Sequence, residues 1–214
     1  MTAMTKQNHD SLRGVYAITD AALTPAQRLR DEVERVLQGG VRMVQYRDKS
    51  QDPALRLAQA TELVRLCHAH SALLIVNDDV DLAKACAADG VHLGKDDETV
   101  QRARATLGTQ RLIGVSCYDS LHRAATAVTE GADYIAFGSF FASSVKPHAV
   151  RAPLSLLAEA KQRWRVPVCA IGGIDARNAP ELIANGADML AVISALFAAS
   201  DPRASALALS ALFP

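Results

Sequence analysis

Residues 72–97 read ALLIVNDDVDLAKACAADGVHLGKDD and carry the pattern that decides the fold. Two short apolar runs with strand character flank a helical segment, which predicts a strand, a helix and a second strand in succession. The first run ends near Asp78-Asp79 and the second near Asp96-Asp97. Strict alternation of strand and helix indicates a parallel sheet, in which polar residues just past the strands gather at one edge.

The same unit recurs along the whole chain. Strands are expected to begin near Gly14, Val41, Ala72, Gly90, Arg111, Asp133, Val166 and Asp188. Helices are expected over residues 25–37, 53–68, 80–88, 98–107, 120–130, 154–163, 176–184 and 201–212. Eight alternating units predict a single (β/α)8 TIM barrel with parallel strands, although periodicity does not distinguish it from an open doubly wound sheet. Residues 13–214 are expected to form this domain, after a flexible N-terminal segment at residues 1–12.

Local signals mark where the expected helices begin and end. Thr24 is expected as the N-cap of a helix that starts at Pro25, and Asp52-Pro53 opens the next one. Gly131 and Gly186 each stand two residues before an expected strand start. Glycine suits the left-handed position that ends a helix.

Composition limits the classes of function. The chain has 214 residues, half of them hydrophobic, which is enough to bury one substantial core. Its 23 basic and 23 acidic residues balance, which argues against a broad nucleic-acid or membrane surface and favours a small charged ligand. Four cysteines without a CxxC pair favour a reduced, cytoplasmic setting. No signal-peptide pattern and no span long and apolar enough for a bilayer is found.

A basic strand end follows the second expected strand. Gln45, Arg47 and Lys49 alternate, so their side chains are expected to point the same way at the end of a strand. Arginine offers a planar fork and lysine a compact charge, which together suit a ligand with more than one phosphate group. A solvated strand end with an ion pair to Asp48 is the alternative.

The two acidic pairs have two readings. Carboxylates from adjacent strand ends, held near a polyphosphate, are the ligands that Mg²⁺ prefers. Each pair also precedes a helix, and Asp79 is well placed to cap the helix after it. Helix capping is therefore the alternative for each pair taken alone.

Three further features bear on the site. Gly172-Gly173 at a strand end, with Ile193-Ser194 at the next, matches the phosphate site that barrels often build after their seventh and eighth strands. A tight turn without a ligand is the alternative. Hydroxyl groups and an ammonium in the loop at residues 143–146 suit a second anion. His92 lies inside a strand without metal-ligand spacing, which favours a core or supporting role over a zinc ligand.

In this order the motifs resemble those of the thiamine phosphate synthase family, from Gly14 to about Phe197. They are QYRDK at 45–49, VNDDV at 76–80, GVHLGKDD at 90–97, GVS at 114–116, residues 138–146, IGGI at 171–174 and ISA at 193–195. The resemblance implies a (β/α)8 transferase that joins a hydroxymethylpyrimidine diphosphate to a thiazole phosphate or its carboxylated form. The products would be thiamine phosphate and pyrophosphate, with carbon dioxide from the carboxylated form.

The resemblance also implies roles for single residues. The catalytic residues would be Arg47, Lys49, Ser116 and Lys146. The substrates would be bound by Gln45, Tyr46, Arg47, Asp48, Lys49, Asn77, Ser116, Ser143, Ser144, Val145, Lys146, Gly172, Gly173, Ile193 and Ser194. Asp78 and Asp97 would hold Mg²⁺. The partners would be the two small-molecule substrates, without nucleic acid or membrane, and a homo-oligomer is compatible with this.

Two departures from the family pattern concern the substrates. The loop that usually reads Pro-Thr-x-Thr-Lys is Ala-Ser-Ser-Val-Lys at residues 142–146, so Val145 cannot donate a hydroxyl and Ser144 or the backbone must substitute. Lys95 stands where the family commonly has glutamine. Its charge either aids diphosphate binding or faces water.

Two other functions compete with the synthase. A thiazole tautomerase is a related barrel that would not need the full diphosphate and metal set. The synthase is favoured over it by the retention of Arg47, Lys49, Asp78, Asp97 and Lys146. A non-catalytic sensor on the same barrel would bind the pyrimidine diphosphate and release no pyrophosphate.

Overall fold

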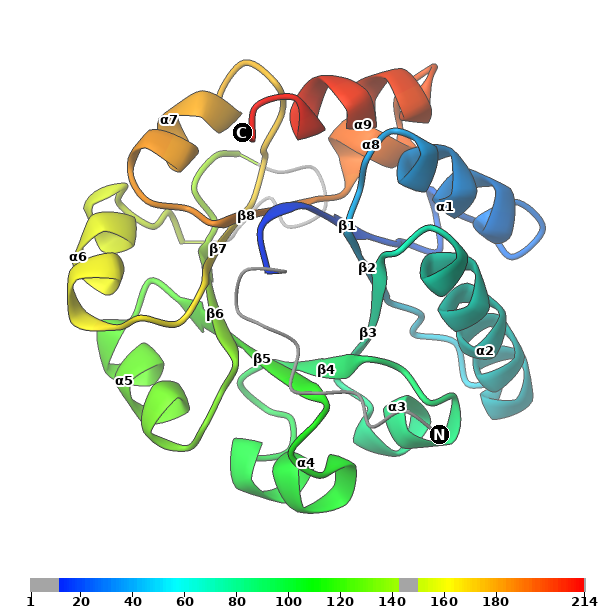
Figure 1. Ribbon diagram of the computed structural model, residues 1–214, viewed down its shortest axis with the longest axis horizontal. Coiled ribbons are helices and arrows are strands. Elements are labelled where there is room, and N and C mark those ends of the chain that lie inside the picture. Colours follow the sequence, from blue (N-terminus) through cyan, green and yellow to red (C-terminus); the bar gives the residue numbers. More distant parts are fainter. Residues whose placement is uncertain (1–11, 143–149, 214) are drawn as a thin grey trace.

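The protein is a closed barrel of eight parallel strands, as its computed structural model shows for residues 12–142 and 150–213. The strands are β1 Gly14–Ile18, β2 Met43–Tyr46, β3 Leu73–Asn77, β4 Gly90–Leu93, β5 Leu112–Tyr118, β6 Tyr134–Gly138, β7 Val168–Ile171 and β8 Met189–Val192. Each strand pairs with the next, and β1 pairs with β8 through Gly14 and Met189. The barrel prediction is confirmed, and this last pairing excludes the open sheet (Figure 1).

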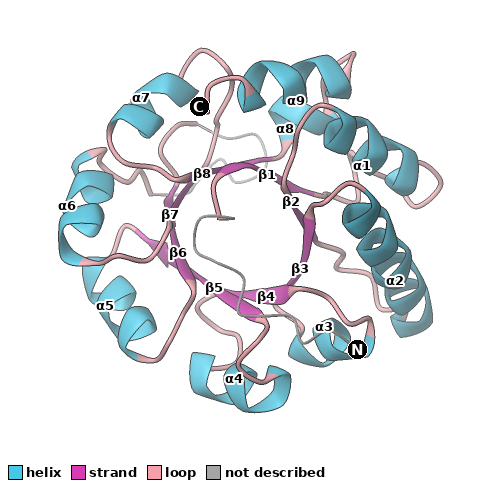
Figure 2. Cartoon of the chain, viewed as in Figure 1, coloured by secondary structure: helices cyan, strands magenta, loops and turns pink. Residues whose placement is uncertain are grey.

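Helices surround the strands as an outer ring (Figure 2). They are α1 Leu29–Gln38, α2 Pro53–Ala69, α3 Val80–Ala85, α4 Val100–Leu107, α5 Leu121–Thr129, α6 Ser155–Arg163, α7 Ala179–Ala184, α8 Ser194–Phe197 and α9 Pro202–Ser210. The four-residue helix α8 was not expected, because Ser194 ends the apolar run of β8 and four residues are too few to show a helical period. Within the two described ranges, no helix is long and apolar enough to cross a membrane.

The strands are buried on both faces and separate two apolar cores. Outward-facing residues such as Val15 and Ala17 pack against the helices, in the larger core. Inward-facing residues such as Tyr16 and Ile18 fill the barrel interior together with Met189. Alternation along a strand produces this division, because successive side chains point to opposite faces. The inward positions near the strands' carboxyl ends therefore form the floor of the barrel mouth.

The start of α1 differs from the sequence prediction. The helix begins at Leu29, four residues after Pro25, and Arg28 at its N-cap position makes no side-chain cap. The hydroxyl of Thr24 instead donates to the carbonyl of Asp20 and accepts from the amide of Asp20. Thr24 thus closes a turn behind β1, so it is not available to cap a helix. Asp52, by contrast, caps α2 as expected by accepting from the amide of Leu55.

Aspartates stabilise the opposite, amino-terminal end of the barrel. Asp89, Asp133 and Asp188 precede β4, β6 and β8, and each carboxylate accepts a backbone N–H from a neighbouring strand at 2.8 Å. Each also pairs with a cationic or titratable side chain from the outer helices. The pairs are His68 with Asp89, Arg104 with Asp133 and Lys161 with Asp188. The sequence analysis recognised only the glycines beside these residues, of which Gly131 and Gly186 adopt the expected left-handed conformation.

Candidate active site

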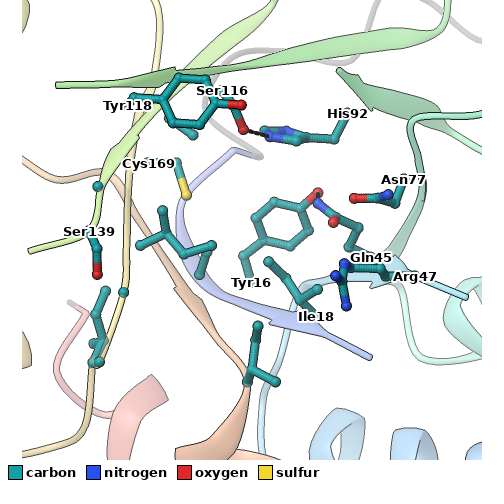
Figure 3. Close-up of a pocket in the computed structure, with 18 of the residues that line it drawn as sticks. Tyr16, Ile18, Gln45, Arg47, Asn77, His92, Ser116, Tyr118, Ser139 and Cys169 are labelled. Atoms are coloured by element: carbon teal, nitrogen blue, oxygen red, sulfur yellow. Dashed lines mark hydrogen bonds between the residues drawn. The ribbon is translucent and has the colours of Figure 1, made fainter. Parts of the chain in front are cut away.

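A cleft of about 1070 Å³ opens at the carboxyl ends of the strands. It is lined by eight of the residues that the sequence placed in the site, namely Gln45, Arg47, Asn77, Ser116, Gly172, Gly173, Ile193 and Ser194. Gln45, Arg47 and Asn77 gather on one side of it, with Ser116 across the barrel (Figure 3). The parallel strands bring these residues together although they lie far apart in the sequence. Lys95 lines the same cleft and is exposed.

Three residues of the segment at 46–49 lie away from this cleft. Tyr46 is buried on the helix side of β2, where its hydroxyl donates to Gln59 Oε1 at 2.7 Å. Asp48 accepts from the amide of Ser50. Lys49 follows the end of β2 and is exposed, and its positive charge partly opposes the rise in the pKa of Asp78 that burial and Asp97 cause. Gln45 and Arg47 therefore keep the expected alternation into the cleft, whereas Lys49 does not line it.

Arg47 is held by a residue that the sequence analysis did not select. Its guanidinium lies 3.2 Å from the carboxylate of Asp20, and both side chains are about one-fifth exposed, at 21% and 18%. The amide of Arg47 also donates to the hydroxyl of Thr19. Asp20 lies two residues past the end of β1, so the rule that polar residues after strands meet at one edge would have found it.

The two acidic pairs differ in whether they cap a helix. Asp79 caps α3 by accepting from Leu82 at 2.8 Å, and it pairs with Arg56 at 2.9 Å. Neither carboxylate of the second pair caps α4, because Thr99 does so. Asp97 instead accepts from the amide of Gly94 at 2.5 Å. Helix capping therefore accounts for Asp79, whereas Asp97 binds the backbone amide of Gly94 and caps no helix.

Asp78 and Asp97 face each other. Burial, followed by the hydrogen bond and the negative charge of Asp97, raises the pKa of Asp78 to about 6. Asp78 has a left-handed backbone conformation, with φ of 63°. Two carboxylates this close repel when both are ionised, and a divalent cation would offset that repulsion. In the part of the chain that the structure describes, no cluster of three or more His, Cys, Asp or Glu residues could hold a metal.

The backbone conformation of the loop after β7 requires its pair of glycines. Gly172 and Gly173 have φ of 106° and 63°, which side chains rarely adopt. A Cβ on Gly172 would lie 1.9 Å from Ser139 Oγ, and one on Gly173 would lie 2.2 Å from the carbonyl of Ala142. The loops after β6 and β7 thus pack backbone against backbone at the edge of the cleft. This packing leaves no room for side chains there.

A chain of hydrogen bonds crosses the barrel interior at the floor of the cleft, and we call it the buried polar chain. All of its members except Tyr134 line the cleft. It comprises Gln45, Tyr16, Tyr134, His92 and Ser116, joined in that order by contacts of 2.7, 3.0, 3.0 and 2.9 Å. His92 therefore has the supporting position that its sequence context predicted. The sequence analysis missed the two tyrosines, because each occupies an apolar strand and reads as an ordinary core residue.

The wall near β4 and β5 is held by Arg123, which was also missed. Its guanidinium donates to the carbonyls of Ser116 and Gly94, both at 2.6 Å. It also lies 5.8 Å from the ring centroid of Tyr118, which lines the cleft. Arg123 thereby joins the strand end that carries Ser116 to the loop that carries Asp97. The predicted site residues Ser143, Ser144, Val145 and Lys146 lie outside the described residues.

Fold and cleft together define a (β/α)8-barrel enzyme with a polar ligand site at the carboxyl ends of its strands. The sequence model of the thiamine monophosphate synthase family matches residues 15–196. The chain therefore belongs to this family, whose members are transferases of thiamine biosynthesis.

Individual proteins agree with the family match. The thiamine-phosphate synthase of Thioalkalivibrio sulfidiphilus is 51% identical over 204 residues, which cover 95% of this chain and 97% of that one. The enzyme of the same name from an Azoarcus species is 54% identical over 204 residues, covering 95% and 98%. Among solved structures, a thiamine phosphate pyrophosphorylase from Pyrococcus furiosus superposes with a TM-score of 0.86 at 34% identity, covering 95% and 96%.

Proposed function

We propose that the protein condenses 4-amino-2-methyl-5-hydroxymethylpyrimidine diphosphate with thiazole phosphate, or its carboxylated form, to give thiamine phosphate and pyrophosphate. Carbon dioxide would also leave from the carboxylated substrate. The observation that carries the proposal is the meeting of Gln45, Arg47, Asn77 and Ser116 in one cleft. Asp78 and Asp97, which face each other and directly follow the lining residues Asn77 and Asp96 in sequence, add a pair of carboxylates. The names of the relatives support the same reaction.

The pyrimidine diphosphate would lie between β2 and β5. Arg47 would bind the diphosphate, because a guanidinium presents two parallel donors to phosphate oxygens. Its ion pair with Asp20 keeps the guanidinium oriented before the substrate arrives. The charge of Lys49 acts on Asp78, so Lys49 would lie beside the diphosphate whose Mg²⁺ Asp78 would hold. Gln45, Asn77 and Ser116 would then contact the pyrimidine end.

Asp78 and Asp97 would hold Mg²⁺, together with diphosphate oxygens and water. Magnesium commonly takes only one or two carboxylates from the protein and the rest of its ligands from phosphate and water. The raised pKa of Asp78 fits this role, because two crowded carboxylates favour a cation between them. When bound, the metal would supply positive charge to the departing pyrophosphate.

The reaction proposed is a dissociative substitution without an enzyme nucleophile. The C–O bond to the diphosphate breaks, and the electron-rich aminopyrimidine carries the resulting positive charge. The thiazole nitrogen then donates its electron pair to that carbon. Arg47 and Lys49 would stabilise the charge that grows on the leaving group, while the cleft holds the two reactants in line. Lys146, outside the described residues, would share this task.

The thiazole phosphate would lie at the opposite side of the cleft, near the ends of β7 and β8. Backbone groups of Gly172-Gly173 and of Ile193-Ser194 would approach its phosphate, since no side chain blocks the glycine loop. Residues 143–145 would complete this site. Four buried free thiols suit the reducing cytoplasm as the place of action. A homo-oligomer stays a prediction.

One assay separates the synthase from its competitors. Purified protein is mixed with both substrates and Mg²⁺, and thiamine phosphate and pyrophosphate are measured over time, with omission of the thiazole as the control. The synthase forms both products only in the complete mixture. A tautomerase would isomerise the carboxythiazole phosphate alone, and a sensor would bind the diphosphate without releasing pyrophosphate. Either of those results would overturn the proposed function.

A further inference from the structure

The buried polar chain has a single direction of hydrogen donation. The amide nitrogen of Gln45 only donates, so the hydroxyl of Tyr16 accepts from it, while either hydroxyl can be the donor between Tyr16 and Tyr134. In the order in which each tyrosine both accepts and donates within the chain, Tyr16 donates to Tyr134. In that order Tyr134 donates its one hydrogen to Nδ1 of His92, a contact whose direction depends on the tautomer of the ring. A neutral imidazole whose Nδ1 accepts carries its proton on Nε2, and this Nε2–H donates to Ser116.

The two ends of the chain then offer opposite groups to the cleft. Ser116 accepts from His92, so its own hydrogen is left to donate to an acceptor in the cleft. Gln45 uses its amide nitrogen inside the barrel, so its carbonyl oxygen is the group left to accept. One side of the cleft therefore presents an acceptor and the other a donor. Their polarity is set by the three side chains between them, of which Tyr16 and His92 also line the cleft.

Packing and burial hold this direction in place. Burial raises the pKa of both Tyr16 and Tyr134 above the usual value, so each keeps the single hydrogen that the chain requires. Their rings meet edge to face, with centroids 6.1 Å apart. The Tyr134 ring also occupies the space beside Gly114, where a Cβ would lie 2.0 Å from the ring. Tyr134 can therefore neither shift nor lose its proton easily.

We propose that Tyr16, Tyr134 and His92 are positioning residues that set the hydrogen-bond polarity of the cleft through Gln45 and Ser116. The ligand that fits is a planar heteroaromatic ring with a donor toward Gln45 and an acceptor toward Ser116. An aminopyrimidine has both, as an exocyclic amine and ring nitrogens. The identity of this ligand rests on the proposed function, whereas the direction of the chain rests on its contacts and on each tyrosine hydroxyl both donating and accepting.

The first test reads the direction of the chain without any substrate. Full-length protein labelled with ¹⁵N-histidine is examined at neutral pH by long-range ¹H–¹⁵N NMR. The His92 signals are assigned as those lost in His92→Gln. We expect the tautomer with the proton on Nε2 of His92. A proton on Nδ1, or on both nitrogens, would mean that the chain does not run as derived and would overturn the inference.

The second test asks whether Tyr134 acts through Ser116. Binding of the pyrimidine diphosphate with Mg²⁺ is measured by calorimetry for wild type, Tyr134→Phe, Ser116→Ala and the double variant. We expect each single change to weaken binding about tenfold, because a directed hydrogen bond is lost. The double variant should also be weaker by about tenfold, since both changes break one path. Losses that multiply to about a hundredfold, or no loss in Tyr134→Phe, would overturn the inference.

Two further variants separate positioning from mere structural support. Tyr16→Phe breaks the chain one step earlier and replaces Tyr134→Phe if that protein does not fold. Tyr46→Phe removes a buried hydroxyl on the helix side of the barrel, and its fall in melting temperature shows the structural cost of such a loss. Failure of the proposed function and failure of this inference give different results. A wild type that makes no thiamine phosphate removes the proposed function, whereas a wrong His92 tautomer in an active enzyme removes only this inference.

Discussion

Replacing Asp78 with asparagine is expected to stabilise the metal-free protein while removing its response to Mg²⁺. Asparagine has the same shape and tolerates the left-handed backbone at this position, where φ is 63°. Alanine at the same φ would add strain of roughly 1 kcal/mol. The asparagine variant therefore changes the charge of the site and little else.

The size of the effect follows from the pKa of Asp78. That pKa is raised from 3.8 to about 6, so the ionised carboxylate is less favourable in the folded protein than in the unfolded chain. One pKa unit corresponds to about 1.4 kcal/mol, which sets an upper limit of roughly 3 kcal/mol. Because Asp78 is only half-buried and is screened by water, about 1 kcal/mol is the expected stabilisation in the variant.

The pH dependence has a definite sign. An acid with a raised folded-state pKa destabilises the fold fully above that pKa, and the cost disappears below the unfolded-state value. Asp78→Asn should therefore be more stable than wild type at pH 8, by about 2–4 °C in melting temperature for a chain of this length. The difference should shrink between about pH 6 and pH 4.

Thermal unfolding with and without Mg²⁺ is the assay, combined with the rate of thiamine phosphate formation. Wild type should gain stability from Mg²⁺, because a ligand that binds only the folded state stabilises it. Asp78→Asn should gain little and lose at least roughly a hundredfold in rate. The neighbour Asp79 provides the control, since Asp79→Asn keeps a capping side chain and should keep the Mg²⁺ response. A variant less stable than wild type at pH 8, or one that keeps Mg²⁺-dependent turnover, would refute the reasoning.

Three other changes test separate parts of the structure. Gly172→Ala should lower the free energy of unfolding by at least about 2 kcal/mol in urea, because its Cβ meets the loop after β6, whereas Gly108→Ala has open space and should lose only about 1 kcal/mol. Asp20→Asn should release Arg47 and raise KM for the pyrimidine diphosphate about threefold to tenfold, with little change in melting temperature; an unchanged KM would separate Asp20 from binding. Asp133→Asn should lower the free energy of unfolding by about 2 kcal/mol, because it leaves buried partners unpaired at the amino-terminal end of the barrel; equal stability would contradict this.

The sequence predicted the strands and helices well where the hydrophobic periodicity and the turn-forming residues indicate the same boundary. Strand starts at Gly14 and Gly90 coincide with the structure, and the others differ by one or two residues. The start of α1 was wrong, because a threonine followed by a proline is equally consistent with a turn. Which of the two forms depends on Asp20, whose backbone binds Thr24. The residue types around Thr24 do not show whether a turn or a helix start forms there.

The acidic pairs show how far residue types can be interpreted alone. Both capping and metal binding were consistent with the residues around Asp78 and Asp97, and neither could be excluded from spacing. The structure assigns capping to Asp79 and Thr99, because their side chains reach the amides of the following helices. It also brings Asp78 and Asp97 together and gives Asp78 a left-handed backbone, neither of which a sequence pattern predicts. The metal itself stays a prediction.

By itself, the sequence determined the order of strands and helices and the end of the barrel where polar groups gather, since both follow from local periodicity. Only the tertiary structure decided that the barrel closes and which inward side chains meet inside it. Tyr16 and Tyr134 are 118 residues apart, yet closure between β1 and β8 brings their hydroxyls within 3.0 Å. The physical reason is that alternation fixes the face on which a side chain lies, whereas its partner across the barrel depends on the register and closure of all eight strands.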